Sequence, residues 1–234
     1  RAFCEYLRGL NIIITEKEFA SYTGNKTIDV IEKLSSRLGI QDTEKFYNDI
    51  MIIARKIYNE ELTSVKGAEK FLNEISQQKF IASNSWKERV IQGLEKVNFY
   101  QFFGEKNIFS FDMVKKPKPD PDVYLKVIEN MKINPDKTII IEDSVVGVQA
   151  GVAANMRVIG LTIGGHWVGR SSQSLCDAGS FAIASNCEEL IKIMELGIPV
   201  REFWVLGDPI IGYLSFNREC SQIMGLYVAS PGKG

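Results

Sequence analysis

The sequence predicts an α/β fold, in which a parallel sheet covered by helices follows a smaller all-helical region. Short apolar runs alternate with amphipathic helical segments from residue 65 to about residue 196. Such alternation is typical of a parallel sheet whose strands are joined by crossover helices, giving three layers. Before residue 65 the apolar residues recur only at helical spacing, as at Phe46, Ile50, Ile53 and Ile57, so we expect no strand there.

Four apolar runs are predicted as strands, and they lie at residues 80–82, 138–141, 158–161 and 181–184. Helices are expected to begin near residues 68, 86, 121, 145 and 188. These elements place a helical region at residues 1–64 and the α/β core at residues 65–196. Residues 197–234 contain apolar side chains without a clear period and stay unassigned.

The composition is that of an ordinary globular protein, since 45% of the 234 residues are hydrophobic and 24% are charged. With 28 basic and 29 acidic residues, the chain has no excess of positive charge that would attract a nucleic acid or an anionic membrane. No apolar run approaches the roughly 20 residues that cross a bilayer. The scattered cysteines suggest reduced thiols without a zinc pair, namely Cys4, Cys176, Cys187 and Cys220. We expect a cytoplasmic monomer that binds neither nucleic acid nor membrane.

Three loops follow predicted strands, and ligands of parallel sheets bind at that edge. The first loop contains Ser83, Asn84 and Ser85 at the start of a helix. Backbone N–H groups and the helix dipole favour an anion at such a place, and a serine hydroxyl adds a donor. The alternative is that one of these residues only caps the helix.

The second loop reads K-P-K-P-D-P-D from Lys116 to Asp122. Alternating prolines hold this segment extended, so Lys118 sits on a stiff support that suits a phosphoryl group. The alternative is a solvated basic turn before a helix. The third loop contains Glu142 and Asp143 directly after a buried strand, where hard oxygens suit Mg²⁺ but also suit a helix cap.

Taken in this order, the three loops resemble motifs two, three and four of the haloacid dehalogenase superfamily, β-phosphoglucomutase and phosphoglycolate phosphatase-like subfamily. The matching segments are Ser83-Asn84-Ser85, K-P-D-P-D-V-Y-L from Lys118 and I-E-D-S-V-V-G-V-Q-A from Ile141. The resemblance covers about residues 1–193. It implies a Rossmann-type core with a helical cap at residues 1–64, and a Mg²⁺-dependent phosphatase for a small phosphorylated metabolite such as a sugar phosphate.

The resemblance also assigns roles to single residues. Ser83 would hold a phosphoryl oxygen, assisted by backbone N–H groups around Asn84. Lys118, rather than Lys116, would stabilise the charge of the nucleophile and of the phosphoryl group. Asp143 would bind Mg²⁺ directly, with Glu142 supporting the metal site. Ser144 would help to position Lys118.

A loop within the predicted cap corresponds to the family's substrate-reading loop and contains Gly24 and Lys26. Lys26 would then contact a second anionic or hydroxyl group of the substrate. The alternative is that Gly24 is a turn residue and Lys26 a surface charge. His166, the one histidine of the sequence, is interpreted as a plain loop residue.

The family's first motif, a strand ending in D-x-D that carries the nucleophilic aspartate, does not occur in the sequence. In the family fold that strand lies in the middle of the sheet. We therefore expect an N-terminally truncated chain with an open core, poor stability and no activity. In a less favoured alternative, residues 203–208 supply the missing strand from the far end with Asp208 as nucleophile, although Ile210 stands where the second aspartate belongs.

Three functions stay open at this point. The favoured one is a phosphatase that works through an aspartyl-phosphate, which water then hydrolyses. A mutase of the β-phosphoglucomutase type would instead return the phosphoryl group to a sugar. A non-catalytic phosphate-binding protein would keep the phosphate pocket without a nucleophile.

Overall fold

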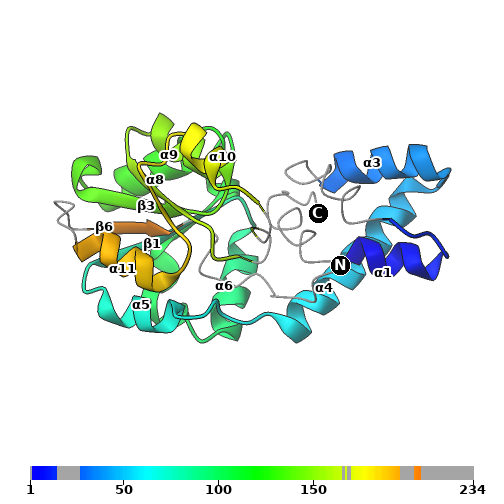
Figure 1. The fold of residues 1–234 in the computed structure, drawn as a ribbon, viewed down its shortest axis with the longest axis horizontal. Helices are drawn as coiled ribbons and strands as arrows, with labels where there is room; N and C mark the ends of the chain where they lie inside the picture. The colour runs from blue at the N-terminus through cyan, green and yellow to red at the C-terminus, as the bar shows by residue number, and fades with distance from the viewer. Residues whose placement is uncertain (1, 15–26, 165–166, 168–169, 196–202, 207–234) are drawn as a thin grey trace.

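The computed structural model describes residues 2–14, 27–164, 167, 170–195 and 203–206. Figure 1 shows an α/β core on one side and a group of helices on the other. These helices are α1 (Ala2–Gly9), α3 (Thr27–Leu38) and α4 (Thr43–Glu61), and we call them the cap. The α/β class with an all-helical first region is therefore confirmed.

The cap has its own apolar core, which the helical spacing of the sequence produces. Phe3 and Leu7 from α1 meet Phe46 and Ile50 from α4, and all four are buried. At its amino end α4 is capped by Asp42, whose carboxylate accepts a hydrogen bond of 2.8 Å from the backbone N–H of Lys45. Such a cap satisfies one of the N–H groups that a helix leaves open at this end.

The far end of α4 is attached to α6 (Lys87–Lys96) of the core. The Tyr58 hydroxyl donates a hydrogen bond of 3.2 Å to the carbonyl of Arg89, whose guanidinium lies 5.0 Å from the centre of the Tyr58 ring. Lys96 also donates to the carbonyl of Asn59. Cap and core are thus joined by contacts between α4 and α6 as well as by the chain.

The core contains a parallel six-stranded sheet with the order β2-β1-β6-β3-β4-β5. Its strands are β1 (Gln78–Ser83), β2 (Ile108–Ser110), β3 (Thr138–Glu142), β4 (Arg157–Leu161), β5 (Ala182–Ala184) and β6 (Phe203–Leu206). The four runs predicted as strands correspond to β1, β3, β4 and β5. The sequence did not predict β2.

Two helical layers cover the sheet because successive strand side chains point to opposite faces. On one face Ile139 and Ile141 pack with α5 (Ala68–Glu74), α6, α7 (Tyr100–Phe103) and α11 (Cys187–Glu195). On the other face Ile140 packs with α8 (Asp122–Met131), α9 (Val145–Ala153) and α10 (Gln173–Asp177). Three short 3₁₀ helices, η1 (Glu105–Asn107), η2 (Phe111–Met113) and η3 (Pro135–Lys137), complete the connections.

The centre of the sheet corrects the sequence interpretation. The strand β6 comes from the segment left unassigned, and it pairs in parallel with β1 on one side and β3 on the other. Leu206 lies opposite both Ile81 and Ile141. The expected gap in the middle of the sheet is therefore filled, as the less favoured alternative for residues 203–208 required. Asp208, the second part of that alternative, lies outside the described residues.

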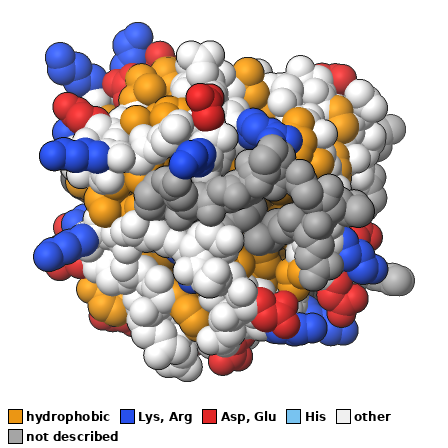
Figure 2. Space-filling view, turned by 90° about the vertical axis from the view of Figure 1, so that its left-hand side faces the viewer, with side chains coloured by type: hydrophobic (Ala, Val, Ile, Leu, Met, Phe, Trp, Pro, Cys, Tyr) orange, Lys and Arg blue, Asp and Glu red, His pale blue; other side chains and the backbone are white. Residues whose placement is uncertain are grey.

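The surface agrees with the balanced charge of the sequence. Figure 2, seen from the side of the core away from the cap, shows basic and acidic side chains scattered over the visible described face. None of the helices in the described part of the chain combines the length and the apolar character that a membrane span requires.

Candidate active site

The predicted site loops meet at one edge of the sheet. Ser83 is the last residue of β1 and Glu142 is the last residue of β3. Because the strands are parallel, these two ends lie at the same edge, and the arrow of β6 in Figure 1 shows that this edge points toward the cap. The loop that contains Lys118 reaches the same place by hydrogen bonds to both neighbouring segments.

The first loop is shaped by the buried hydroxyl of Ser83, which accepts a hydrogen bond of 2.9 Å from the backbone N–H of Ser85. The following helix α6 has Trp86 as its N-cap residue and no side-chain capping bond. The interpretation of Ser83, Asn84 or Ser85 as a simple helix cap is therefore wrong. The hydroxyl of Ser83 keeps its own hydrogen to donate, as a phosphate-binding serine requires.

Asn84 connects the first loop to the second. Its amide nitrogen donates to the carbonyl of Lys118 at 3.1 Å, and its amide oxygen accepts from the N–H of Lys118 at 2.9 Å. All these groups are buried, so the two bonds hold the Lys118 backbone in a fixed place. The sequence predicted Asn84 as part of the phosphate loop through its backbone, and the structure adds this side-chain contact.

The second loop separates its two lysines clearly. The side chain of Lys116 is 67% exposed and pairs with Asp120 at 3.4 Å, whereas the side chain of Lys118 is 2% exposed. The Lys118 ammonium donates to the carbonyl of Ala82 at 2.8 Å and to Glu142 Oε1 at 2.5 Å. A solvated basic turn describes Lys116 but not Lys118. A buried cation therefore lies at the carboxyl ends of β1 and β3.

Glu142 is the counter-ion of Lys118 and is itself almost completely bonded. Its Oε1 also accepts a hydrogen bond of 2.7 Å from the hydroxyl of Tyr124 on α8. Its Oε2 accepts from the backbone N–H groups of Asp143 and Ser144 and from the Ser144 hydroxyl, at 3.0–3.3 Å. Five donors thus satisfy the two oxygens of this buried carboxylate.

Gly147 in α9 makes room for this carboxylate. A Cβ atom added at Gly147 would lie 2.0 Å from Cδ of Glu142. The Ser144 hydroxyl accepts from the Gly147 N–H at 3.1 Å, so it caps α9 while it donates to Glu142. A glycine inside a helix costs stability, and here the close approach of Glu142 explains it.

Asp143 follows Glu142 and is also buried. Its backbone carbonyl accepts a hydrogen bond of 3.0 Å from the indole N–H of Trp167, a buried residue packed among α8, α9 and α10. Asp143 is the second carboxylate at this strand end, and Mg²⁺ binds one or two carboxylates plus water and phosphate oxygens. Among the residues described, no group of three or more His, Cys, Asp or Glu side chains is placed to hold a metal ion.

The structure thus brings together Ser83, Asn84, Lys118, Glu142 and Asp143, as the sequence predicted. Gly24, Lys26 and His166 lie outside the described residues, so their predicted roles stay predictions. The sequence interpretation missed three contributors to the site, namely Tyr124, Gly147 and Trp167. A glycine in the first turn of the helix after Glu142 was a usable signal, since it indicates a close approach.

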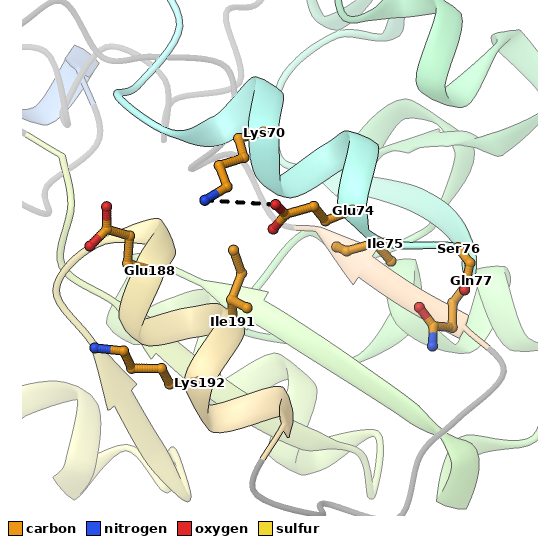
Figure 3. Close-up of a pocket in the computed structure, with 8 residues that line it drawn as sticks. All are labelled: Lys70, Glu74, Ile75, Ser76, Gln77, Glu188, Ile191 and Lys192. Carbon is orange, nitrogen blue, oxygen red and sulfur yellow. Dashed lines mark ion pairs between the residues drawn. The ribbon is translucent and has the colours of Figure 1, made fainter.

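A separate surface groove lies between α5 and α11 (Figure 3). Ile191 faces the groove, and Lys70 and Glu74 form an ion pair of 3.7 Å along α5. Ser76 and Gln77 lie just before the first residue of β1, so the groove extends to the opposite edge of the sheet from Ser83. None of the predicted site residues lines it.

Comparison with known proteins identifies the class. Residues 2–161 match the model of the haloacid dehalogenase-like hydrolase family, and the chain belongs to that family. Over 161 residues it is 27% identical to 6-phosphogluconate phosphatase of Escherichia coli, covering 68% of this chain and 72% of the relative. Over 167 residues it is 26% identical to the phosphorylated carbohydrates phosphatase of Thermotoga maritima, covering 69% and 74%.

Solved structures show the same fold. A haloacid dehalogenase-like protein from Agrobacterium tumefaciens superimposes with a TM-score of 0.71 at 24% identity, over 83% of this chain and 89% of that one. A putative β-phosphoglucomutase from Thermotoga maritima gives 0.70 at 22% identity, over 84% and 90%. The predicted superfamily and subfamily resemblance is therefore confirmed.

Proposed function

We propose that this protein is a Mg²⁺-dependent phosphatase that hydrolyses a small phosphorylated carbohydrate. The observation that carries the proposal is the buried Lys118 ammonium, held between the Ala82 carbonyl near the end of β1 and Glu142 at the end of β3. Two relatives that the chain covers for more than two thirds of their length are phosphatases of phosphorylated sugars or sugar acids by name. Family membership supports the same reaction class.

In this proposal each residue has a separate task. Lys118 balances the negative charge on the phosphoryl group, and the Ser83 hydroxyl donates a hydrogen bond to one of its oxygens. Asp143 would hold Mg²⁺, which supplies charge stabilisation to the phosphoryl oxygens when bound. An aspartate oxygen attacks phosphorus as the P–O bond to the sugar breaks, and the sugar oxygen takes a proton and leaves as a hydroxyl. Water then attacks phosphorus, the aspartyl–phosphate bond breaks, and inorganic phosphate is released with the aspartate restored.

The proposed reaction requires a nucleophilic aspartate at the carboxyl end of the central strand, and the central strand of this chain is β6. In the sequence Asp208 stands two residues after Leu206, and it lies outside the described residues. Two sources are therefore to be distinguished. Either a segment encoded upstream supplies the nucleophile and this chain alone is inactive, or Asp208 does so.

Phosphate release from a panel of sugar phosphates, with Mg²⁺ and with EDTA, tests the proposal on this chain and on one extended by its upstream coding sequence. Lys118→Met and Asp143→Asn should each lower kcat/KM by about a hundredfold or more in the active form. Lys116→Met is the matched control, because this exposed lysine lies in the same loop, and it should stay within about twofold.

The nucleophile is located by Asp208→Asn. Loss of activity in the unextended chain assigns the reaction to Asp208, whereas activity only in the extended chain assigns it to the upstream segment. Phosphoryl transfer to a sugar in place of phosphate release would replace the phosphatase by a mutase. Phosphate binding without turnover in either chain would leave a non-catalytic phosphate-binding protein.

A further inference from the structure

Tyr124 is a buried polar residue that has no role in the proposed reaction as described. It is the third residue of α8, its side chain is fully buried, and its hydroxyl lies 2.7 Å from Glu142 Oε1. The same ring has the Lys118 ammonium 5.0 Å from its centre. One side chain therefore contacts both members of the buried ion pair.

The contacts of Tyr124 with Glu142 and with Lys118 affect how the N–H groups of the Lys118 ammonium are oriented. An ammonium has three N–H donors on a flexible stem, and two of them are used by Ala82 and Glu142. These are its two acceptors within the described residues, and the third donor is the one that the proposed function directs at a phosphoryl oxygen. Where this donor points depends on how firmly Glu142 Oε1 is held.

Apart from Lys118 itself, Tyr124 is the one donor to Oε1 in the part of the chain that the structure describes. The three donors on the other side of the carboxylate, from Asp143 and Ser144, all bind Oε2. A carboxylate can turn about its terminal bond, which has a broad torsional minimum. The Tyr124 hydroxyl limits that rotation, and the ring face attracts the cation from a second direction.

We propose that Tyr124 is a positioning residue that aims the Lys118 ammonium at the phosphoryl group by fixing Glu142. This inference rests on the proposed function for its purpose, but its geometric part concerns Lys118 alone. It also changes the role of Glu142, which acts as the oriented counter-ion of Lys118 and not as a metal-supporting carboxylate. Loss of the Tyr124 hydroxyl should therefore weaken phosphate binding and leave Mg²⁺ binding unchanged.

Tyr124→Phe removes the hydroxyl and keeps the ring, and Tyr124→Leu removes both. The first measurement is acetylation by acetic anhydride in the folded full chain, mapped by mass spectrometry. Lys116, in the same loop and exposed, is the internal standard. We expect the ratio of Lys118 to Lys116 acetylation to rise about threefold or more in Tyr124→Phe, and further in Tyr124→Leu. Tyr100→Phe on α7 is the control tyrosine and should not change the ratio.

The second measurement is calorimetric binding of inorganic phosphate and of Mg²⁺, each titrated separately. Tyr124→Phe should weaken phosphate binding about tenfold, the scale of one lost hydrogen bond to a charged group, with the Mg²⁺ affinity unchanged. A purely structural role would instead lower the thermal unfolding midpoint and weaken both ligands together.

The outcomes separate the two proposals. An unchanged acetylation ratio in Tyr124→Phe overturns the positioning role, and so does a parallel loss of Mg²⁺ affinity. If wild-type protein binds no phosphate but the acetylation ratio still responds, the positioning role stands and the proposed function fails.

Discussion

Two neighbouring parts of the core are built in different ways. At the carboxyl ends of β1 and β3, a polar cluster joins residues that adjoin strands or rigid turns, with Lys118 and Glu142 at its centre. Between the same two strands, the middle of the sheet is filled by β6, which lies near the far end of the chain. Each member of the cluster lies in a short sequence motif, whereas only the pairing with distant segments identifies the central strand.

The central strand β6 and the polar cluster are stabilised by different interactions. β6 has a neighbour on both sides, so its backbone groups are satisfied by β1 and β3 together. The cluster depends on one buried ion pair and the hydrogen bonds around it. Changes at β6 should therefore affect the whole core, and changes at the cluster should have smaller effects on stability.

The largest expected effect comes from prolines in β6. Trp204→Pro combined with Val205→Pro removes one N–H toward each neighbour, because successive residues of a strand bond to opposite sides. At about 3 kcal/mol for each proline, we expect a loss of roughly 6 kcal/mol, which is comparable to the whole stability of a domain. Urea unfolding followed by circular dichroism measures it.

A control proline is available at Ser172, whose φ of −70° already suits the proline ring. Ser172→Pro should change the unfolding midpoint only slightly. If the double proline variant in β6 unfolds at the same midpoint as Ser172→Pro, β6 does not complete the core, and the open sheet that the sequence suggested is restored.

The second effect tests the cluster. Glu142→Gln leaves the Lys118 ammonium buried without a counter-charge, which should cost about 3 kcal/mol or more. Asp120→Asn is the matched control, since it removes the partner of Lys116 from a pair whose side chains are 67% and 44% exposed. This change should cost less than about 1 kcal/mol. Equal losses in the two variants, measured by urea unfolding, would show that burial does not distinguish the two pairs.

The comparison between the cluster and β6 also shows which parts of the site could be predicted from the sequence. The stiff K-P-K-P segment indicated a lysine held in place, and the position within the motif selected Lys118 over Lys116, which the burial of its side chain supports. Glu142 and Asp143 were found through the order and spacing of the three loops, since acidic residues after a strand also suit a helix cap. The hydrogen bond from Tyr124 to Glu142 was not predictable, because it joins two separate elements.

The central strand was harder to predict for a physical reason. β6 has four residues, and the apolar side chains that follow it in the sequence have no clear period to indicate a strand–helix unit. Its partners are not its neighbours in sequence, since the chain passes from β5 at the edge of the sheet to the centre. Periodicity describes a segment by itself and carries no information on such distant pairing.

The smallest expected effect concerns Cys187, which reports whether the helix before β6 stays packed. Cys187 is buried at the start of α11 against Gly67, and burial raises the pKa of its thiol from 9.0 to about 11. The folded state therefore holds this proton more tightly than the unfolded chain. The contribution of the protonated Cys187 thiol to the stability of the folded state is complete below about pH 9 and is lost as the pH rises through about 11.

At pH 8 the thiolate is the reactive form, so iodoacetamide should modify Cys187 about tenfold more slowly, or slower still, than the exposed Cys176. Peptide mapping of the two sites measures the ratio. In the double proline variant of β6 the protection of Cys187 should disappear, because α11 leads from β5 toward β6 in the chain and packs over the same core. Protection that survives in a variant lacking β6 pairing would show that the α5–α11 layer is stable without the central strand, and the contribution of β6 would then be confined to its contacts with β1 and β3.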